Sequence, residues 1–104
     1  MTYDFFYTYI LSSASGTLYI GITNDIKRRI AEHKAKINPG FSSKYSCNRL
    51  VFIERFLDPS DAILREKQLK NWNRDKKERL IWSQNPGWHD MSEGWRLPVV
   101  TRYK

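Results

Sequence analysis

The sequence has very little cysteine and no long hydrophobic run. Cys47 is the only cysteine among 104 residues, which excludes an internal disulfide and a zinc site built from several cysteines. No apolar stretch approaches the roughly 20 residues of a membrane-spanning helix, and the first residues do not combine a basic segment with an apolar one. We therefore expect a reduced, cytoplasmic protein that is neither exported nor bound to a membrane.

Acidic residues are also scarce. There are 11 Asp and Glu against 18 Lys and Arg, which gives a net charge of +7 and a pI near 9.7. Residues 1–24 contain no Lys or Arg, whereas residues 25–57 contain eight basic and three acidic residues. Such a charge favours a polyanionic partner such as nucleic acid, with a merely solvated basic surface as the alternative.

The beginning of the chain predicts an antiparallel hairpin. Residues 5–11 alternate with period two, which places Tyr7 and Tyr9 on one face and Thr8 and Ile10 on the other. A run of small turn-forming residues, SSASGT, follows with Gly16 available for a positive φ, and residues 18–22 form a second apolar strand.

The following segments predict helices that pack on the hairpin. Polar residues 23–25 can cap a helix that runs to about Ile37, with Ile26 and Ile30 facing the core and Arg29 and His33 beside them. A third strand is expected at residues 50–56 and a helix from Asp58 to about Trp72.

A last helix is expected at residues 75–84, with Leu80, Ile81 and Trp82 facing inward. The predicted fold class is α+β, in which a three-stranded antiparallel sheet is flanked by helices in the order β-β-α-β-α-α. We expect residues 1–85 to form the functional domain and residues 86–104 to form an irregular extension packed on it by Trp88 and Trp95.

Four short motifs occur in a distinctive order. The triplets Tyr7-Thr8-Tyr9 and Tyr19-Ile20-Gly21 are followed by Arg29 and then by Glu66 within the segment REKQLKNW. This order resembles the GIY-YIG nuclease superfamily over residues 5–85, and most of all its small single-domain bacterial members, which are related to the N-terminal nuclease domain of the excision-repair endonuclease. Tyr7 and Thr8 stand where the family name has glycine and isoleucine. Tyr7 is therefore a candidate for contacting the substrate in place of a family residue.

The resemblance implies a metal-dependent endonuclease acting on nucleic acid, with DNA as the expected substrate. Glu66 would hold one Mg²⁺ or Mn²⁺ ion, and one carboxylate is sufficient because Mg²⁺ keeps several waters and takes oxygen ligands from the phosphate. Arg29 would bind the scissile phosphate through its planar guanidinium. Tyr9 and Tyr19 would orient or deprotonate the attacking water, and His33 would assist.

Each of these residues also has a structural alternative. Glu66 can pair with Lys70 at i+4, the tyrosines can be ordinary strand aromatics, and His33 can be a core histidine with one hydrogen bond. The unperturbed pKa of a tyrosine is near 10, so a catalytic tyrosine needs Arg29 and the metal to lower its pKa.

Further residues are candidates for contacting the substrate. Gly21 leaves space that a side chain would fill beside Tyr19, and Lys44 and Tyr45 lie in the polar loop between residues 38 and 48. Asn85 matches a late asparagine of the family. Two other functions remain open: a non-catalytic nucleic-acid-binding module, and a protein adaptor that uses the Trp-rich C-terminal residues.

Overall fold

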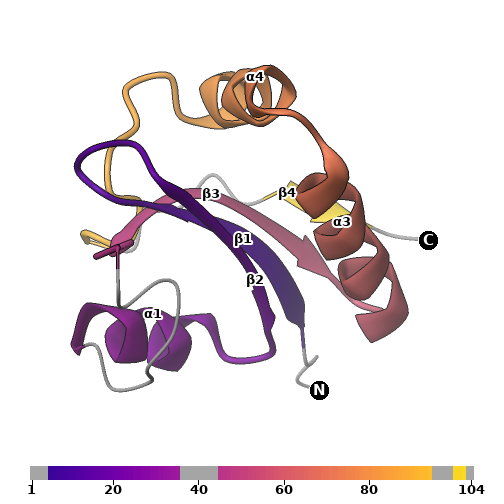
Figure 1. Cartoon of the computed structure of the whole chain (residues 1–104). Coiled ribbons are helices and arrows are strands. Elements are labelled where there is room, and N and C mark those ends of the chain that lie inside the picture. Colours follow the sequence, from indigo (N-terminus) through magenta and orange to yellow (C-terminus); the bar gives the residue numbers. More distant parts are fainter. Residues whose placement is uncertain (1–4, 36–44, 95–99, 103–104) are drawn as a thin grey trace.

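A four-stranded sheet forms the centre of the molecule (Figure 1). The computed structural model describes residues 5–35, 45–94 and 100–102. The strands are β1 (Phe6–Ser12), β2 (Leu18–Thr23), β3 (Arg49–Phe56) and β4 (Val100–Arg102), in the order β2-β1-β3-β4. The antiparallel group β2-β1-β3 confirms the predicted sheet.

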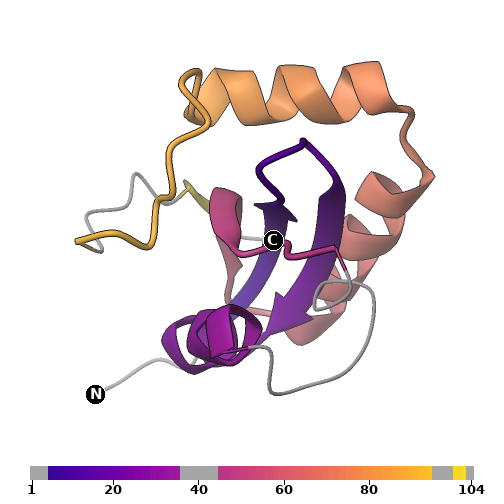
Figure 2. The ribbon, with the colours of Figure 1, turned by 60° about the vertical axis from the view of Figure 1, so that its left-hand side comes forward.

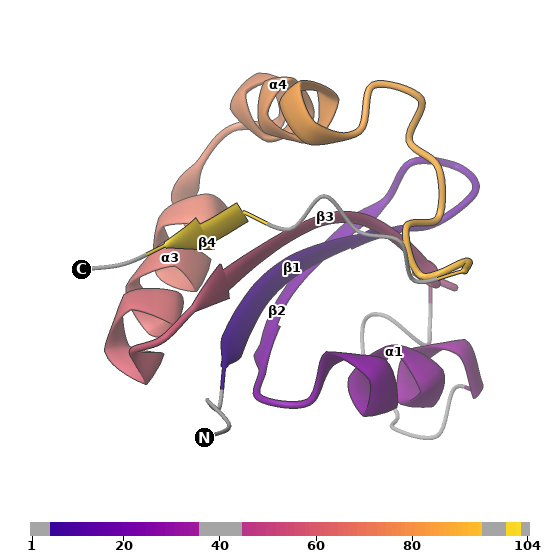
Figure 3. The same ribbon diagram turned by 180° about the vertical axis from the view of Figure 1, so that it is seen from behind.

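The short strand β4 was not predicted. It runs parallel to the end of β3, where Val100 pairs with Glu54 and Arg102 pairs with Phe56 (Figure 3). Only three residues form this strand, within a stretch that shows no lasting period of two, so its local sequence gave no signal. It pairs there because β3 is the outer strand of the antiparallel group and presents unpaired backbone N–H and C=O groups.

The turn between β1 and β2 forms as its small residues predicted. Ser13 and Thr17 are joined by a backbone hydrogen bond of 2.9 Å, and the Ser13 hydroxyl accepts a second bond from the Thr17 amide. Gly16 has a φ of +94°, which glycine adopts without the penalty of a side chain. The resulting register places Tyr9 directly opposite Gly21.

Among the described residues, three helices cover the sheet: α1 (Ile26–Ala35), α3 (Pro59–Asn71) and α4 (Arg74–Gln84). The Asp58 side chain caps α3 by accepting a hydrogen bond from the Ser60 amide, and Asn73 caps α4 by accepting one from the Lys76 amide. The helix α1 lies on one face of the sheet and α3 and α4 lie on the other (Figure 1). In Figure 2, α4 passes over the end of the hairpin, where Arg74 approaches Gly16.

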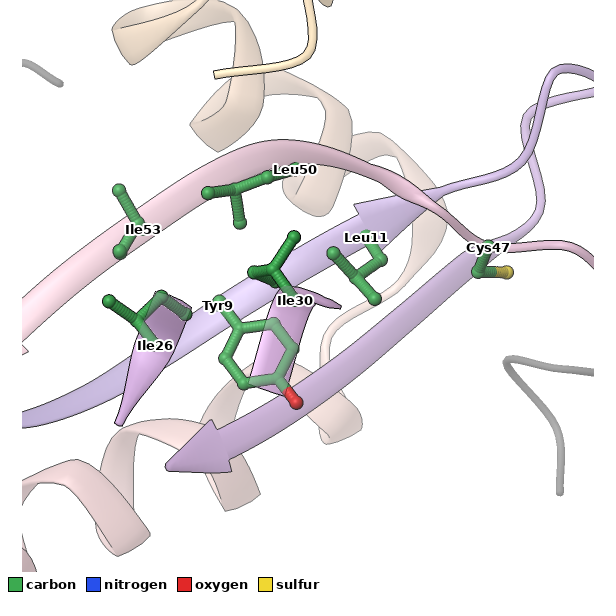
Figure 4. Packing of buried hydrophobic residues seen from close by; sticks show 7 residues of the cluster. All are labelled: Tyr9, Leu11, Ile26, Ile30, Cys47, Leu50 and Ile53. Atoms are coloured by element: carbon green, nitrogen blue, oxygen red, sulfur yellow. The ribbon is translucent and has the colours of Figure 1, made fainter. Parts of the chain in front are cut away.

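Each face of the sheet has its own hydrophobic core. Ile26 and Ile30 of α1 pack against odd-numbered residues of β1, and Figure 4 shows the Tyr9 ring among the aliphatic residues of this cluster. On the opposite face, Leu69 of α3 and Ile81 of α4 pack against Ile10 and its neighbours on the sheet. The alternation in β1 and β2 therefore predicted correctly which residues serve each core.

The prediction for Trp82 was wrong. Ile81 is fully buried and Leu80 is partly buried, but Trp82 is 66% exposed. Three consecutive residues of a helix span about 200° around its axis, so a single sheet face cannot cover all of them. The predicted Ile37 and Trp95 contacts lie outside the described residues.

The described part of the C-terminal extension packs on the sheet and on α1. The Met91 amide donates to the Leu50 carbonyl, and the Asp90 carboxylate accepts from the Leu50 amide at 3.2 Å. The same carboxylate forms an ion pair with Lys34 of α1. Trp88 packs against the core beneath α4.

One acidic residue is buried within the apolar strand β3. Glu54 is 1% exposed, and Arg65 of α3 donates to its two carboxylate oxygens at 2.7 and 3.3 Å. A carboxylate in this position needs such a partner because an unpaired buried charge is strongly unfavourable. The pair fixes the orientation of α3 relative to the sheet.

Candidate functional site

Tyr9 lies at the centre of the candidate site. It is fully buried on β1, and its ring extends across Gly21 of the edge strand β2. A Cβ at position 21 would lie 2.5 Å from the Tyr9 Cζ and hydroxyl oxygen and 3.0 Å from the Tyr19 ring. The expected requirement for glycine is therefore confirmed, and Tyr9 rather than Tyr19 makes the closer approach.

The Tyr9 hydroxyl contacts two side chains from α1. Arg29 donates from its Nε at 3.4 Å, and the His33 Nε2 lies 3.0 Å from the hydroxyl oxygen. Arg29 and His33 are four residues apart, so consecutive turns of α1 present them on the same side. Sequence reasoning placed these residues correctly beside the core-facing arc of the helix.

Tyr19 completes an aromatic cluster around His33. Its ring centroid lies 5.1 Å from that of His33 and 6.4 Å from that of Tyr9, and both arrangements are inclined rather than stacked. Tyr19 is partly exposed, whereas Tyr9 is buried. The two tyrosines of the motifs thus come together at one site, with different access to solvent.

Burial sets the protonation states of this cluster. It raises the pKa of Tyr9 to about 12, and the positive charge of Arg29 opposes this shift without reversing it. Burial also lowers the pKa of His33 to about 4, and the Arg29 charge acts in the same direction. At neutral pH the Tyr9 hydroxyl therefore keeps its proton, the His33 ring is neutral, and the hydroxyl accepts a hydrogen bond from Arg29. The tautomer of the His33 ring decides which partner donates in the hydrogen bond between Tyr9 and His33.

Arg29 lowers the pKa of Tyr9 as expected, but burial has the larger and opposite effect on this pKa. The hydrogen bond and charge of Arg29 favour the tyrosinate, but removing the hydroxyl from water is the larger effect. The pKa of Arg29 is itself raised, first by its hydrogen bond with Tyr9, so Arg29 stays fully charged. Arg29 also forms an ion pair with Glu32 at 3.2 Å.

Glu66 lies on α3 and acts on Tyr9 through its charge. Its negative charge lies close enough to Tyr9 to add to the raised pKa of that hydroxyl, although burial is the main cause. The side chain is 17% exposed, and its carboxylate pairs with Lys70 at 3.5 Å, as the structural alternative predicted. Ala62 and Leu69 on the same side of α3 are fully buried.

The residues around Glu66 can supply only part of the coordination shell of a metal ion. The described residues contain no group of three or more His, Cys, Asp or Glu side chains able to hold an ion. A partly buried carboxylate with remaining exposure fits Mg²⁺ or Mn²⁺ that takes its other ligands from water and phosphate. Lys70 would then have to release the carboxylate.

The other predicted contact residues lie at different places. Tyr7 is partly buried and packs against the core beneath α1, and Tyr45 is 44% exposed. The buried Asn85 amide donates to the Val51 and His89 carbonyls, so its hydrogen bonds join α4 to the sheet and the extension. Lys44 lies outside the described residues.

Sequence reasoning missed the side chains that hold the site in position. Glu32 pairs with Arg29, and its spacing of i+3 on one helix was a usable signal. The buried pair of Glu54 and Arg65 was also missed, although an acid within the apolar strand LVFIERF indicated the need for a partner.

Strands β1 and β2 thus place two tyrosines at the edge of a small antiparallel sheet, α1 adds an arginine and a histidine beside them, and α3 carries a glutamate. This arrangement defines a compact α+β protein whose polar cluster on β1, β2 and α1 lies within the electrostatic influence of Glu66 on α3. The model of the GIY-YIG catalytic domain matches residues 5–79, and the chain belongs to this superfamily of nucleases. The resemblance noted in the sequence is therefore confirmed.

The chain is similar to several UPF0213 proteins. It is 46% identical to one from Natronomonas pharaonis over 79 residues, which cover 72% of this chain and 88% of that protein. It is 39% identical to one from Staphylococcus saprophyticus, with 75% and 95% covered. The solution NMR structure of a UPF0213 protein from Bacillus halodurans has a TM-score of 0.56 and 28% identity, and the match covers 86% of this chain and 95% of that one.

Within the part of the chain that the structure describes, no helix combines the length and the apolar character needed to cross a lipid bilayer.

Proposed function

We propose that this protein is a metal-dependent endonuclease that hydrolyses phosphodiester bonds in DNA. The supporting observation is the hydrogen-bonded group of Arg29, Tyr9 and His33, which lies within the electrostatic reach of Glu66. Phosphodiester hydrolysis needs an oriented water, stabilisation of the charge on the phosphate oxygens and assistance for the leaving oxygen. These side chains have the chemistry for all three.

Arg29 is the phosphate-binding residue in this proposal. Its Nε is directed to Tyr9 and its Nη1 to Glu32, so the guanidinium is held in one orientation before substrate binds. It stays charged at every accessible pH, and its side chain retains 29% exposure for contact with an anionic oxygen. The phosphate thereby meets a preorganised cation next to the tyrosines.

Tyr9 and Tyr19 orient the attacking water. In the free protein Tyr9 is protonated, and its bonds with Arg29 and His33 hold the hydroxyl oxygen in place. A Mg²⁺ ion held by Glu66 and the phosphate would supply the positive charge that stabilises the transition state and favours ionisation of nearby hydroxyl groups. Tyr19 is the more accessible of the two tyrosines.

The decisive experiment compares matched variants in a DNA cleavage assay with Mg²⁺. We expect Arg29→Ala and Glu66→Gln each to lower the cleavage rate by roughly 100-fold or more, because each removes a charge that acts on the transition state. Arg28→Ala is the control, since it removes the neighbouring arginine, which pairs with Asp25 and is 65% exposed. It should change the rate by less than about threefold.

The substrate panel should contain single-stranded, duplex and branched DNA, together with matching RNA. Absence of cleavage of all DNA forms with both Mg²⁺ and Mn²⁺ would contradict the proposal.

A non-catalytic nucleic-acid-binding module is the competing function. The observation that favours it is the ion pair between Glu66 and Lys70, which occupies the carboxylate proposed for the metal. Salt-sensitive DNA binding that persists in EDTA and in Glu66→Ala, with no cleavage, would support this function instead. A Lys70→Ala variant that gains metal affinity at Glu66 would support the nuclease.

A further inference from the structure

A shallow cavity lies where α3 gives way to α4. It has a volume of about 400 Å³ and is open to solvent, and most of its lining is apolar. Four residues line it: Trp72, Lys76, Arg79 and Leu80. None of them belongs to the group around Tyr9. The volume lies within the usual range for sites that hold a small planar ligand.

Trp72 is held in place before any ligand arrives. It caps the C-terminus of α3, and the Arg65 guanidinium lies 5.2 Å from the centroid of its ring. Arg65 is in turn bound to the buried Glu54 at 2.7 Å and to Gln68 at 2.6 Å. Because this chain of contacts fixes the indole, a planar ligand would bind to it with little further loss of side-chain entropy.

Two cations stand beside this indole on a single face of α4. Lys76, Arg79 and Leu80 follow the spacing i, i+3 and i+4, so they line the cavity together. Neither Lys76 nor Arg79 forms an ion pair with any residue that the structure describes. By contrast, Lys70 pairs with Glu66 and Arg74 pairs with Glu78. The cations at the cavity are therefore available to an anionic ligand.

We propose that this cavity binds an unstacked base of a single-stranded nucleic-acid segment. The base would stack on Trp72 and contact Leu80, and Lys76 and Arg79 would bind the phosphates on either side of it. An aromatic platform between cations is the usual means of holding single strands, because every base has a π-face and every nucleotide carries a phosphate. The net charge of +7 favours the same class of ligand.

If the proposed nuclease function holds, the position of the cavity relative to Glu66 indicates which class of substrate is preferred. Trp72 is six residues beyond Glu66, which corresponds to about 9 Å along a helix. The preferred substrate therefore has an unpaired segment a short distance from the cleaved bond, as at a flap or a junction.

The test measures binding in EDTA, where no cleavage occurs. Fluorescence anisotropy would compare a labelled single-stranded oligonucleotide with a blunt duplex of the same length, at several salt concentrations. We expect Trp72→Ala to weaken single-strand binding by roughly 5-fold to 100-fold and to change duplex binding little. Trp72→Phe should retain most of the affinity, which separates stacking from misfolding, and circular dichroism should confirm that each variant is folded.

Two control variants match these substitutions. Trp82→Ala removes an exposed indole from α4 outside the cavity, and Lys77→Ala removes one charge from the same helix. Arg79→Ala should lower single-strand affinity and reduce the salt dependence by about one phosphate contact, and Lys77→Ala should have a smaller effect. Equal effects of Trp72→Ala and Trp82→Ala, or no effect of Trp72→Ala, would overturn the proposal.

An acidic peptide is the other occupant to exclude. A poly-glutamate peptide that binds in a Trp72-dependent manner, without any preference of the protein for single-stranded nucleic acid, would also overturn the proposal.

The nuclease function is tested separately by Glu66→Gln. If Glu66→Gln abolishes cleavage but Trp72→Ala leaves binding unchanged, only the cavity proposal fails. If Trp72→Ala weakens binding but no DNA is ever cleaved, only the nuclease proposal fails.

Discussion

Replacing Gly21 with alanine should disrupt the site through a single methyl group. Gly21 lies within β2 opposite Tyr9 and does not have a positive φ, so alanine fits its backbone conformation. The new Cβ would lie 2.5 Å from two atoms of Tyr9. Carbon atoms in contact are normally about 3.5–4.0 Å apart, so the ring must move by about 1 Å or more.

The Tyr9 ring has no space for this movement. It is fully buried, and Ile26 and Ile30 of α1 pack in the same cluster. Overpacking of this kind costs about 1–3 kcal/mol, and each hydrogen bond lost from the hydroxyl adds about 1 kcal/mol. The expected loss of stability is therefore about 2–4 kcal/mol, or roughly 10–25 °C in Tm for a domain of this size.

Urea and thermal denaturation would measure this loss, and a cleavage assay would show whether activity falls more than stability explains. Gly94→Ala is the control, because Gly94 has a φ of +72° but no atom within 4 Å of a new Cβ. It should cost only about 1 kcal/mol. A double-mutant cycle with Tyr9→Ala completes the test, since the smaller side chain removes the clash. If the two substitutions have additive effects, the steric explanation is wrong.

Three further predictions concern other parts of the molecule. Glu54→Ala should destabilise the fold by about 3 kcal/mol in urea denaturation because Arg65 loses its buried partner, and a loss below about 1 kcal/mol would contradict this. The pKa of His33 is lowered to about 4 from an unfolded value near 6.5, so its neutral form stabilises the protein above pH 6.5 and this contribution is lost as the pH falls toward 4. The loss of unfolding free energy should reach up to about 3 kcal/mol by pH 4, and it should be absent in His33→Gln. If the stability of the His33→Gln variant falls with pH in parallel with that of the original protein, this prediction is wrong. Cys47 is 1% exposed and burial raises the pKa of its thiol, so a thiol reagent should modify it only as fast as the protein opens; rapid modification without denaturant would show otherwise.

Local sequence patterns were sufficient to predict most of the fold. Alternation in residues 5–11 and 18–22 assigned Tyr9 and Ile10 to opposite faces, because the period of a strand is two. The helices predicted from Asp58 and from residue 75 match α3 and α4, which begin at Pro59 and Arg74. The exposure of Trp82 and the pairing of β4 depend on which distant surface is available, and no local pattern contains that information.

Sequence reasoning named the residues that meet at the candidate site, but it did not predict the pKa of Tyr9. The motifs identified Tyr9 and Arg29, and the helical spacing after Arg29 added His33. The structure brings these three side chains together. The pKa of Tyr9 depends on the depth of its burial, which exceeds the effect of the adjacent arginine. Burial of this kind arises from the packing of α1 on the sheet, so sequence spacing alone could not give its magnitude.

The position of β4 has a consequence for the order of folding during synthesis. The strands and helices that carry Tyr9, Arg29 and Glu66 are complete by residue 84, whereas β4 pairs with β3 only once residues 100–102 have been made. Until then the outer edge of β3 near Glu54 remains open to another strand. A nascent chain would therefore form its candidate site before β4 covers the unpaired edge of β3. The risk of aggregation is greatest in the interval between these two events.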